Sequence, residues 1–222
     1  MKNIILQHYT GFTTPLEDLS IKNIKKYAAK LDTEYRFMEG DVFDNSLTPP
    51  CQKLIMLDEQ FDDYDTVVMF DIDMFTRKGM EENIFDVPGI GMGTEFQLSL
   101  HQKMKSRKPH LTDMRFPYWG GAVWKLTRDQ RQLLRKGFGT WMREFSAGFQ
   151  DEGIMHHLAT LANFKPSDAF LPGNFHWCHC SYRQGIEKAA MIHIRTKVTP
   201  TGPNTSKIAN YNDMIRRGLI EE

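Results

Sequence analysis

Apolar residues in the first third of the chain form short continuous runs that alternate with helical spacings. Residues 3–8 are a mostly apolar run and predict a buried first strand. Residues 14–17 (Thr-Pro-Leu-Glu) have the composition of a helix start, with Thr as N-cap and Glu three positions later. The predicted helix continues through apolar residues at helical spacing, Ile21, Ile24, Ala28 and Leu31. Residues 35–38 are the expected second strand.

A second strand–helix unit follows. Pro49 and Pro50 precede an amphipathic stretch to Leu57 that predicts a helix, and residues 66–70 (Thr-Val-Val-Met-Phe) predict a central parallel strand. This alternation predicts an α/β fold with right-handed crossovers. Ligands in such folds bind at the carboxyl ends of the strands, which here is where Asp71 and Asp73 follow the apolar run.

The second half of the chain has less regular patterns. The basic, apolar-poor stretch 101–110 predicts a mobile loop near the cleft. Four further elements are expected: strands at 120–124 and 191–194, and helices that begin at Thr127 and Asp151. The polar tail after Pro200 is expected to wrap over the surface.

Size and charge restrict the class of protein. With 222 residues, 41% of them hydrophobic, the chain suits one α/β domain. Lys plus Arg and Asp plus Glu are equal at 28 each, so the net charge is zero. A nucleic-acid binder that works by bulk electrostatics is therefore not expected.

The sequence pattern predicts neither a signal peptide nor a membrane span. The first apolar run is too short for a signal peptide, and no run approaches the roughly 20 apolar residues of a membrane span. Cys51, Cys178 and Cys180 make no disulfide framework, which favours a reducing compartment. We expect a soluble, cytoplasmic protein; whether it is virus-encoded or a domain of a longer enzyme stays open.

The Asp71-x-Asp73 pair is the main chemical signal. Carboxylates that end a buried strand are costly without a partner ion. Hard oxygen ligands suit Mn²⁺ or Mg²⁺. In a reaction that releases a nucleoside diphosphate, such an ion would neutralise the charge of this leaving group. The tripeptide alone is weak, since Asp63-Tyr64-Asp65 repeats it in a polar turn whose carboxylates are expected to be solvated. Turn or helix-capping aspartates are the alternative for Asp71 and Asp73.

Three segments resemble motifs of glycosyltransferases with the GT-A fold. Residues 64–75 are similar to their "YD-hydrophobic-DxD" segment, residues 118–124 to their acceptor-side strand, and residues 150–155 to the "D-Q-D" helix start of retaining family 8 enzymes. The small glycosyltransferase domains of chlorella-type viruses are also similar. The resemblance implies a metal-dependent transferase that moves a sugar from a nucleotide-sugar, a UDP-sugar, to a glycan or protein-linked glycan, with retention.

The resemblance also implies an architecture. It predicts one GT-A-type nucleotide-binding domain over residues 1–222, with a mixed, mostly parallel central sheet flanked by helices. Residues 1–100 would be the nucleotide-sugar half, 101–200 the acceptor-side half, and 201–222 a C-terminal tail.

A set of site residues follows from the same resemblance. The metal ligands would be Asp71, Asp73 and His193, and further donor contacts would come from Tyr9, Thr10, Lys53 and Lys197. Family 8 has Gly between its late His and Lys and Pro-Trp after the Lys, whereas this chain has Ile-Arg-Thr at 194–196 and no Pro-Trp after Lys197. A strand-bonded imidazole is the alternative for His193, and surface positions are the alternatives for Tyr9 and Lys53.

Catalysis is assigned to Glu152, which falls where family 8 carries Gln, together with Asp151. A carboxylate beneath the anomeric carbon could stabilise an oxocarbenium-like centre or attack it. First-turn acids favoured by the helix dipole are the alternative. The resemblance implies Trp119, Gly120 and Gly121 on the acceptor side. Trp177 could be a platform for a sugar face and His176 a hydrogen-bond donor to its hydroxyls, with an ordinary aromatic loop as the alternative. Zinc is disfavoured for 176–180 (His-Trp-Cys-His-Cys), because its ligands are too close in sequence to bind one ion together.

Two other functions stay open. Phosphohydrolases of the haloacid-dehalogenase type also end a strand with DxD, and Thr76 and Asp168 are the residues available to complete such a site. A non-enzymatic sugar-binding module is the third possibility, and the paired carboxylates count against it.

Overall fold

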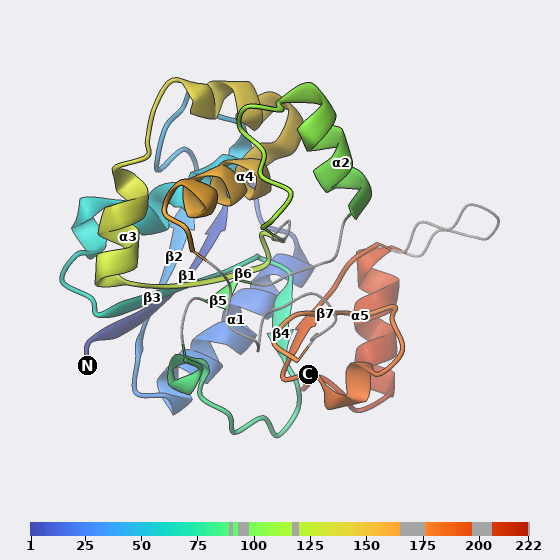
Figure 1. The fold of residues 1–222 in the computed structure, drawn as a ribbon. Helices are drawn as coiled ribbons and strands as arrows, with labels where there is room; N and C mark the ends of the chain where they lie inside the picture. Colours follow the sequence, from blue (N-terminus) through green and yellow to red (C-terminus); the bar gives the residue numbers. More distant parts are fainter. Residues whose placement is uncertain (89–90, 93–97, 117–119, 165–175, 197–205, 222) are drawn as a thin grey trace.

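The computed structural model describes residues 1–88, 91–92, 98–116, 120–164, 176–196 and 206–221 (Figure 1). Its centre is a five-stranded sheet in the order β2-β1-β3-β6-β5. The strands are β1 (Asn3–Tyr9), β2 (Glu34–Glu39), β3 (Thr66–Phe70), β5 (Gly91–Met92) and β6 (Val123–Thr127). Strands β2, β1, β3 and β5 run in one direction and β6 runs against them. The predicted mixed, mostly parallel sheet is confirmed.

Side chains alternate between the two faces of this sheet, as strand geometry requires. Ile4 and Val67 belong to one hydrophobic cluster, whereas their chain neighbours Ile5 and Val68 belong to another. Helix α1 (Pro15–Lys30) covers the second face, and helices α3 (Arg128–Arg135) and α4 (Trp141–Leu161) cover the first (Figure 1). The sheet is therefore buried on both sides, which explains the continuous apolar runs.

Local signals define the helix starts. The Glu17 carboxylate accepts a hydrogen bond from the Thr14 backbone N–H at 2.9 Å, and Thr127 with Gln130 forms the second predicted capping box. The segment predicted as a helix after Pro49 is a 3₁₀ helix, η1 (Pro49–Leu57). The residues that the structure describes also form the shorter 3₁₀ helices η2 (Glu59–Phe61), η3 (Ile84–Asp86) and η5 (Ile186–Lys188).

A small second sheet stands beside the first, in the order β4-β8-β7. Its strands are β4 (Met74–Thr76), β7 (His179–Cys180) and β8 (Met191–His193). Helix α5 (Lys207–Arg216) packs beside this sheet, where Tyr211 and Met214 join a third hydrophobic cluster (Figure 1). The tail was expected to be a polar surface wrap, and that prediction is wrong for residues 207–216, because apolar residues at helical spacing bury one face of α5.

The prediction of a mobile loop for the basic stretch 101–110 is also wrong. Most of it forms helix α2 (Leu98–Arg107), and not a loop without anchors. Met104 is fully buried in the first cluster and His101 is nearly so, and both fix the helix to the domain. No helix among the described residues is long and apolar enough to cross a membrane.

Candidate functional site

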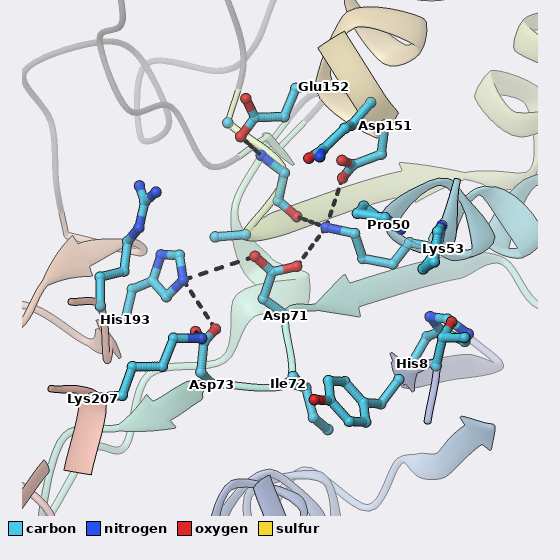
Figure 2. A pocket seen from close by; sticks show the side chains of 18 of the residues that line it. His8, Pro50, Lys53, Asp71, Ile72, Asp73, Asp151, Glu152, His193 and Lys207 are labelled. Carbon is cyan, nitrogen blue, oxygen red and sulfur yellow. Dashed lines mark hydrogen bonds and ion pairs between the residues drawn. The ribbon is translucent and has the colours of Figure 1, made fainter. Parts of the chain in front are cut away.

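A cavity of about 670 Å³ lies at the carboxyl ends of β1 and β3 (Figure 2). Its wall brings together segments that are far apart in the sequence: the end of β1, η1, the turn after β3, the start of β6, the middle of α4, the end of β8 and the start of α5. Most of the predicted site residues line it, namely Tyr9, Thr10, Lys53, Asp71, Asp73, Gly120, Gly121, Asp151, Glu152 and His193.

The turn after β3 positions the two aspartates. The Asp71 N–H donates to the Ala122 carbonyl at 2.9 Å, which extends the pairing of β3 with β6. The Met74 N–H then donates to the Asp71 carbonyl at 3.2 Å, so the chain turns before β4 begins. Met74 pairs with His193 in the antiparallel register of β4 and β8. This pairing places the His193 side chain next to Asp73.

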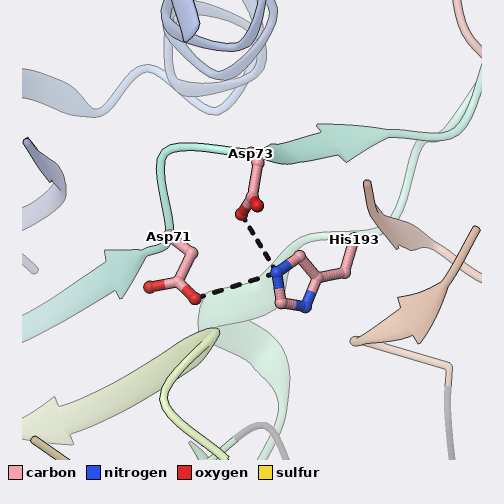
Figure 3. Close-up of side chains that lie close together, drawn as sticks. All are labelled: Asp71, Asp73 and His193. Atoms are coloured by element: carbon pink, nitrogen blue, oxygen red, sulfur yellow. Dashed lines mark ion pairs between the residues drawn. The ribbon is translucent and has the colours of Figure 1, made fainter. Parts of the chain in front are cut away.

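Asp71, Asp73 and His193 form a compact group (Figure 3). Nε2 of His193 is 3.0 Å from Oδ1 of Asp73 and 3.8 Å from Oδ2 of Asp71. Each residue offers a ligand atom, and these atoms lie within 4.8 Å of one another, so one ion could contact all three. Two carboxylates and an imidazole are a donor set that fits Mn²⁺ or Mg²⁺. Among the described residues this is the one such group.

Asp73 is an anion held in a buried place, with 5% of its surface exposed. Burial by itself would raise the pKa of its carboxyl, but His193 and Lys207 outweigh burial and hold the pKa well below its usual range. The Lys207 ammonium lies 2.5 Å from Oδ2 of Asp73. Asp73 is thus ready to bind a cation without first losing a proton.

Lys53 is a buried cation between two carboxylates (Figure 2). Its Nζ lies 2.5 Å from Oδ1 of Asp71, 2.7 Å from Oδ2 of Asp151 and 3.0 Å from the Gly121 carbonyl oxygen. Burial would lower the pKa of Lys53, yet the two carboxylates together raise it above its usual value. Lys53 therefore links the β3 turn to α4 as a permanent charge, and it is not the solvated surface lysine that a helix alone would suggest.

Gly121 is required by the close approach of these groups. A Cβ at this position would lie 2.5 Å from Oδ2 of Asp151 and 2.9 Å from Nζ of Lys53. The Gly121 N–H also donates to Oε1 of Glu152 at 3.0 Å. A side chain at 121 would therefore displace Asp151 and Lys53.

The two acids sit where α4 is interrupted. Gln150 has φ 53° and ψ −150°, which divides the helix and starts a new segment at Asp151. Such a conformation is strained for a residue with a side chain and is often found at functional sites. The prediction of a helix start at Asp151 is confirmed in this form, although the preceding segment from Trp141 was not predicted.

Burial raises the pKa of both acids. Asp151 is 3% exposed, and burial raises its pKa against the opposing effect of Lys53. Burial, together with the charge of Asp151, raises the pKa of Glu152 to about 7. Carboxyl groups with such shifts in a cavity are typical of functional sites.

The end of β1 forms the opposite wall. Tyr9 and Thr10 line the cavity, and the Thr10 hydroxyl is buried with no hydrogen-bond partner among the described residues. Nε2 of His8 lies 2.7 Å from the Gly40 carbonyl oxygen, and burial lowers the pKa of this imidazole. This wall is less charged than the β3 side and suits a neutral ring.

Two predicted residues, His176 and Trp177, are described and lie outside this site. Trp119 and Lys197 lie outside the described residues, as does Asp168 of the alternative function. Trp177 is 4% exposed and packs in the second hydrophobic cluster, and His176 pairs with Glu82 at 2.5 Å. Neither lines the cavity, because the His176 carbonyl accepts hydrogen bonds from the N–H groups of Ala190 and Met191, at the start of β8, and this segment is held beside the core.

Lys207 is a site residue that sequence reasoning missed. It reaches the cavity from the first residue of α5, 134 positions after Asp73. Ser206 caps this helix by accepting from the Ala209 N–H at 3.2 Å. A Ser N-cap before apolar residues at helical spacing was the signal for the helix, but nothing local indicated where its first lysine would point.

The fold is similar to that of solved structures. A chlorella-virus protein described as a glycosyltransferase involved in the glycosylation of the major capsid of PBCV-1 matches with a TM-score of 0.57 and 11% identity, covering 97% of this chain and 100% of that one. An active-site glutamine-to-glutamate mutant of LgtC, a family 8 enzyme, matches with a TM-score of 0.52 and 14% identity, covering 99% and 97%. No family model matches the sequence, and no curated protein matches it significantly. The chain has the GT-A fold.

The raised pKa of Glu152 predicts how stability depends on pH. Between the unfolded value near 4.5 and about 7, the folded protein holds a proton that the unfolded chain has released, so stability falls as pH rises through this window. We expect Glu152→Gln to remove this loss and to gain about 2–3 kcal/mol relative to wild type between pH 5 and pH 8. Urea denaturation at both pH values, with a chelator present, measures the difference.

Glu144→Gln is the matched control, because Glu144 lies on the first segment of α4 with half of its side chain exposed. It should follow the wild-type slope. Parallel slopes for wild type and Glu152→Gln would show that Glu152 titrates normally.

Proposed function

We propose that this protein is a metal-dependent glycosyltransferase that moves a sugar from a nucleotide-sugar, a UDP-sugar, to a glycan or glycoprotein acceptor with retention. One observation carries the proposal: Asp71, Asp73 and His193 converge at the end of β3, in the cavity of a GT-A fold, with Glu152 in the same cavity. The similar solved structures are of glycosyltransferases, and nothing in the fold favours the dehalogenase-type alternative.

Asp71, Asp73 and His193 would hold Mn²⁺ or Mg²⁺. A bound divalent ion neutralises charge on the leaving diphosphate as a Lewis acid. The protein contributes the arrangement of its ligands: Lys53 fixes Asp71 from one side, and the β4–β8 register fixes His193 from the other. Tyr9 and Thr10, on the less charged wall, would contact the base, and the unpaired Thr10 hydroxyl offers a donor and an acceptor to it.

Lys53 is better explained as a positioning residue than as a contact of the donor. Its ammonium already lies within 3.0 Å of three acceptors of the protein, and 9% of its side chain is exposed. A donor phosphate would have to replace one of these partners. A carboxylate of the protein would then lose its ion pair, which is unfavourable. Lys53 would instead keep Asp71 and Asp151 at a fixed separation.

Glu152 would act on the sugar. In its ionised form it can support positive charge at the anomeric carbon as the glycosidic bond to the diphosphate breaks. Its hydrogen bond from the Gly121 N–H fixes one carboxylate oxygen. Gly120 and Gly121 line the cavity beside Glu152 and would leave room for the acceptor to approach the anomeric carbon. Asp151 lies against Gly121. A retaining reaction can use the leaving diphosphate as the base for the acceptor hydroxyl.

The first prediction from this function concerns donor binding. UDP with Mn²⁺ should raise the melting temperature of the wild-type protein, because a ligand that binds only the folded state stabilises it. Asp73→Asn should abolish the metal-dependent part, measured by calorimetry with UDP and Mn²⁺. Asp63→Asn, in the exposed DxD, should bind as wild type does. Unchanged UDP affinity in Asp73→Asn would refute the assignment of the metal site.

A second prediction separates chemistry from binding. Glu152→Gln should lower turnover about 10²-fold, or nearly 3 kcal/mol, because the lost interaction strengthens only as charge develops. Affinity for the donor should stay nearly constant, and Glu144→Gln should behave as wild type. Proton NMR of the first product formed should show the anomeric configuration of the donor. The opposite configuration would exclude retention and make Glu152 or Asp151 a general base for the acceptor.

A further inference from the structure

The ammonium of Lys207 occupies one side of a carboxylate that the proposed metal needs. Each oxygen of Asp73 has its own partner: Oδ1 faces Nε2 of His193 at 3.0 Å, and Oδ2 faces Nζ of Lys207 at 2.5 Å (Figure 2). Asp73 is buried, so its negative charge requires a positively charged group close by. Lys207 supplies the nearest full positive charge.

The position of Lys207 in its helix is unfavourable apart from this contact. It is the first residue of α5, whose first turn contains no acidic residue. A helix N-terminus has a partial positive charge, which disfavours a cation there. The pairing with Asp73 offsets that cost. Each of the two charges therefore stabilises the other.

The two lysines of the site differ in their freedom to move. The Lys53 side chain is 9% exposed and lies against three acceptors, whereas the Lys207 side chain is 42% exposed and pairs with one carboxylate among the residues that the structure describes. A long, flexible lysine at the rim can move its ammonium into solvent when another cation compensates Asp73. Lys207 is therefore less constrained at its carboxylate than Lys53 is at Asp71.

We propose that Lys207 is a built-in competitor of the divalent metal: its ammonium neutralises Asp73 in the metal-free protein and opposes the binding of a metal ion to the same carboxylate. This inference rests on the proposed function, because it assumes the metal site at Asp71, Asp73 and His193. A divalent ion bound to Asp73 would meet the Lys207 charge only a few ångströms away, where repulsion in a partly buried site is strong. Metal affinity without nucleotide is then lower than the three ligands alone would give.

Direct metal binding tests this inference without any activity measurement. Mn²⁺ is titrated into the full chain without nucleotide, and free Mn²⁺ is counted by its electron paramagnetic resonance signal. If Lys207 holds Asp73 in about nine molecules of ten, Lys207→Met should bind Mn²⁺ about tenfold more tightly than wild type. The melting temperature of metal-free Lys207→Met should fall, since Asp73 loses its partner.

Three variants complete the design. Lys207→Arg keeps the charge and should bind Mn²⁺ as weakly as wild type. Arg216→Met, at the other end of α5 with 81% of its side chain exposed, removes a charge from the same helix and should also match wild type. Lys207→Gln has the same expected gain as Lys207→Met and serves if the latter does not fold.

The outcomes separate the two proposals. Wild-type binding that is lost in Asp73→Asn, with equal or weaker binding in Lys207→Met and Lys207→Gln, overturns the competitor role and leaves the metal site intact. No Mn²⁺ binding in either wild type or the Lys207 variants overturns the metal site and the competitor role together. Tighter binding in both uncharged variants, with Lys207→Arg unchanged, supports them both.

Discussion

The site depends on the balance of charge around four carboxylates in one largely buried cavity. Buried carboxylates are unfavourable unless cations or hydrogen bonds compensate them. Lys53 compensates Asp71 and Asp151 from within the protein, while His193 and Lys207 flank Asp73. Among the described residues, the carboxylate of Glu152 accepts one hydrogen bond, from the Gly121 N–H, and burial together with the charge of Asp151 raises its pKa to about 7. The two aspartates proposed to bind the metal are thus paired with positively charged groups, whereas the pKa of Glu152 lies close to neutral pH.

Elements from across the fold bring these charged side chains together. β3 delivers the aspartates to the edge of the sheet, β6 holds Asp71 through the Ala122 carbonyl, and the small second sheet brings in His193. The break at Gln150 directs Asp151 toward Lys53, and the absence of a side chain at Gly121 leaves space for both. Each contact joins segments far apart in the sequence, so the cavity requires the folded domain.

The sequence predicted the elements whose signals are local. The apolar run of β3, followed by Asp71 and Asp73, is readable because a strand buried on both faces must be apolar and a site at its end must be polar. Helix α2 was missed because its anchors are few, chiefly Met104, within a basic segment. The link from Lys53 to Asp151 and the contact of Lys207 could not be predicted, since tertiary packing alone sets them. His193 was placed by the resemblance, and not by any local pattern.

If one divalent ion joins Asp71, Asp73 and His193 to a nucleoside diphosphate, a crystal structure of the protein with UDP and Mn²⁺ should locate that ion through the anomalous signal of manganese. We expect one strong anomalous peak at about 2.0–2.3 Å from an oxygen of each aspartate, from a nitrogen of His193 and from an oxygen of the diphosphate. A diphosphate bound in the cavity with no manganese peak at these three residues, or a peak elsewhere, would contradict this assignment of the metal site.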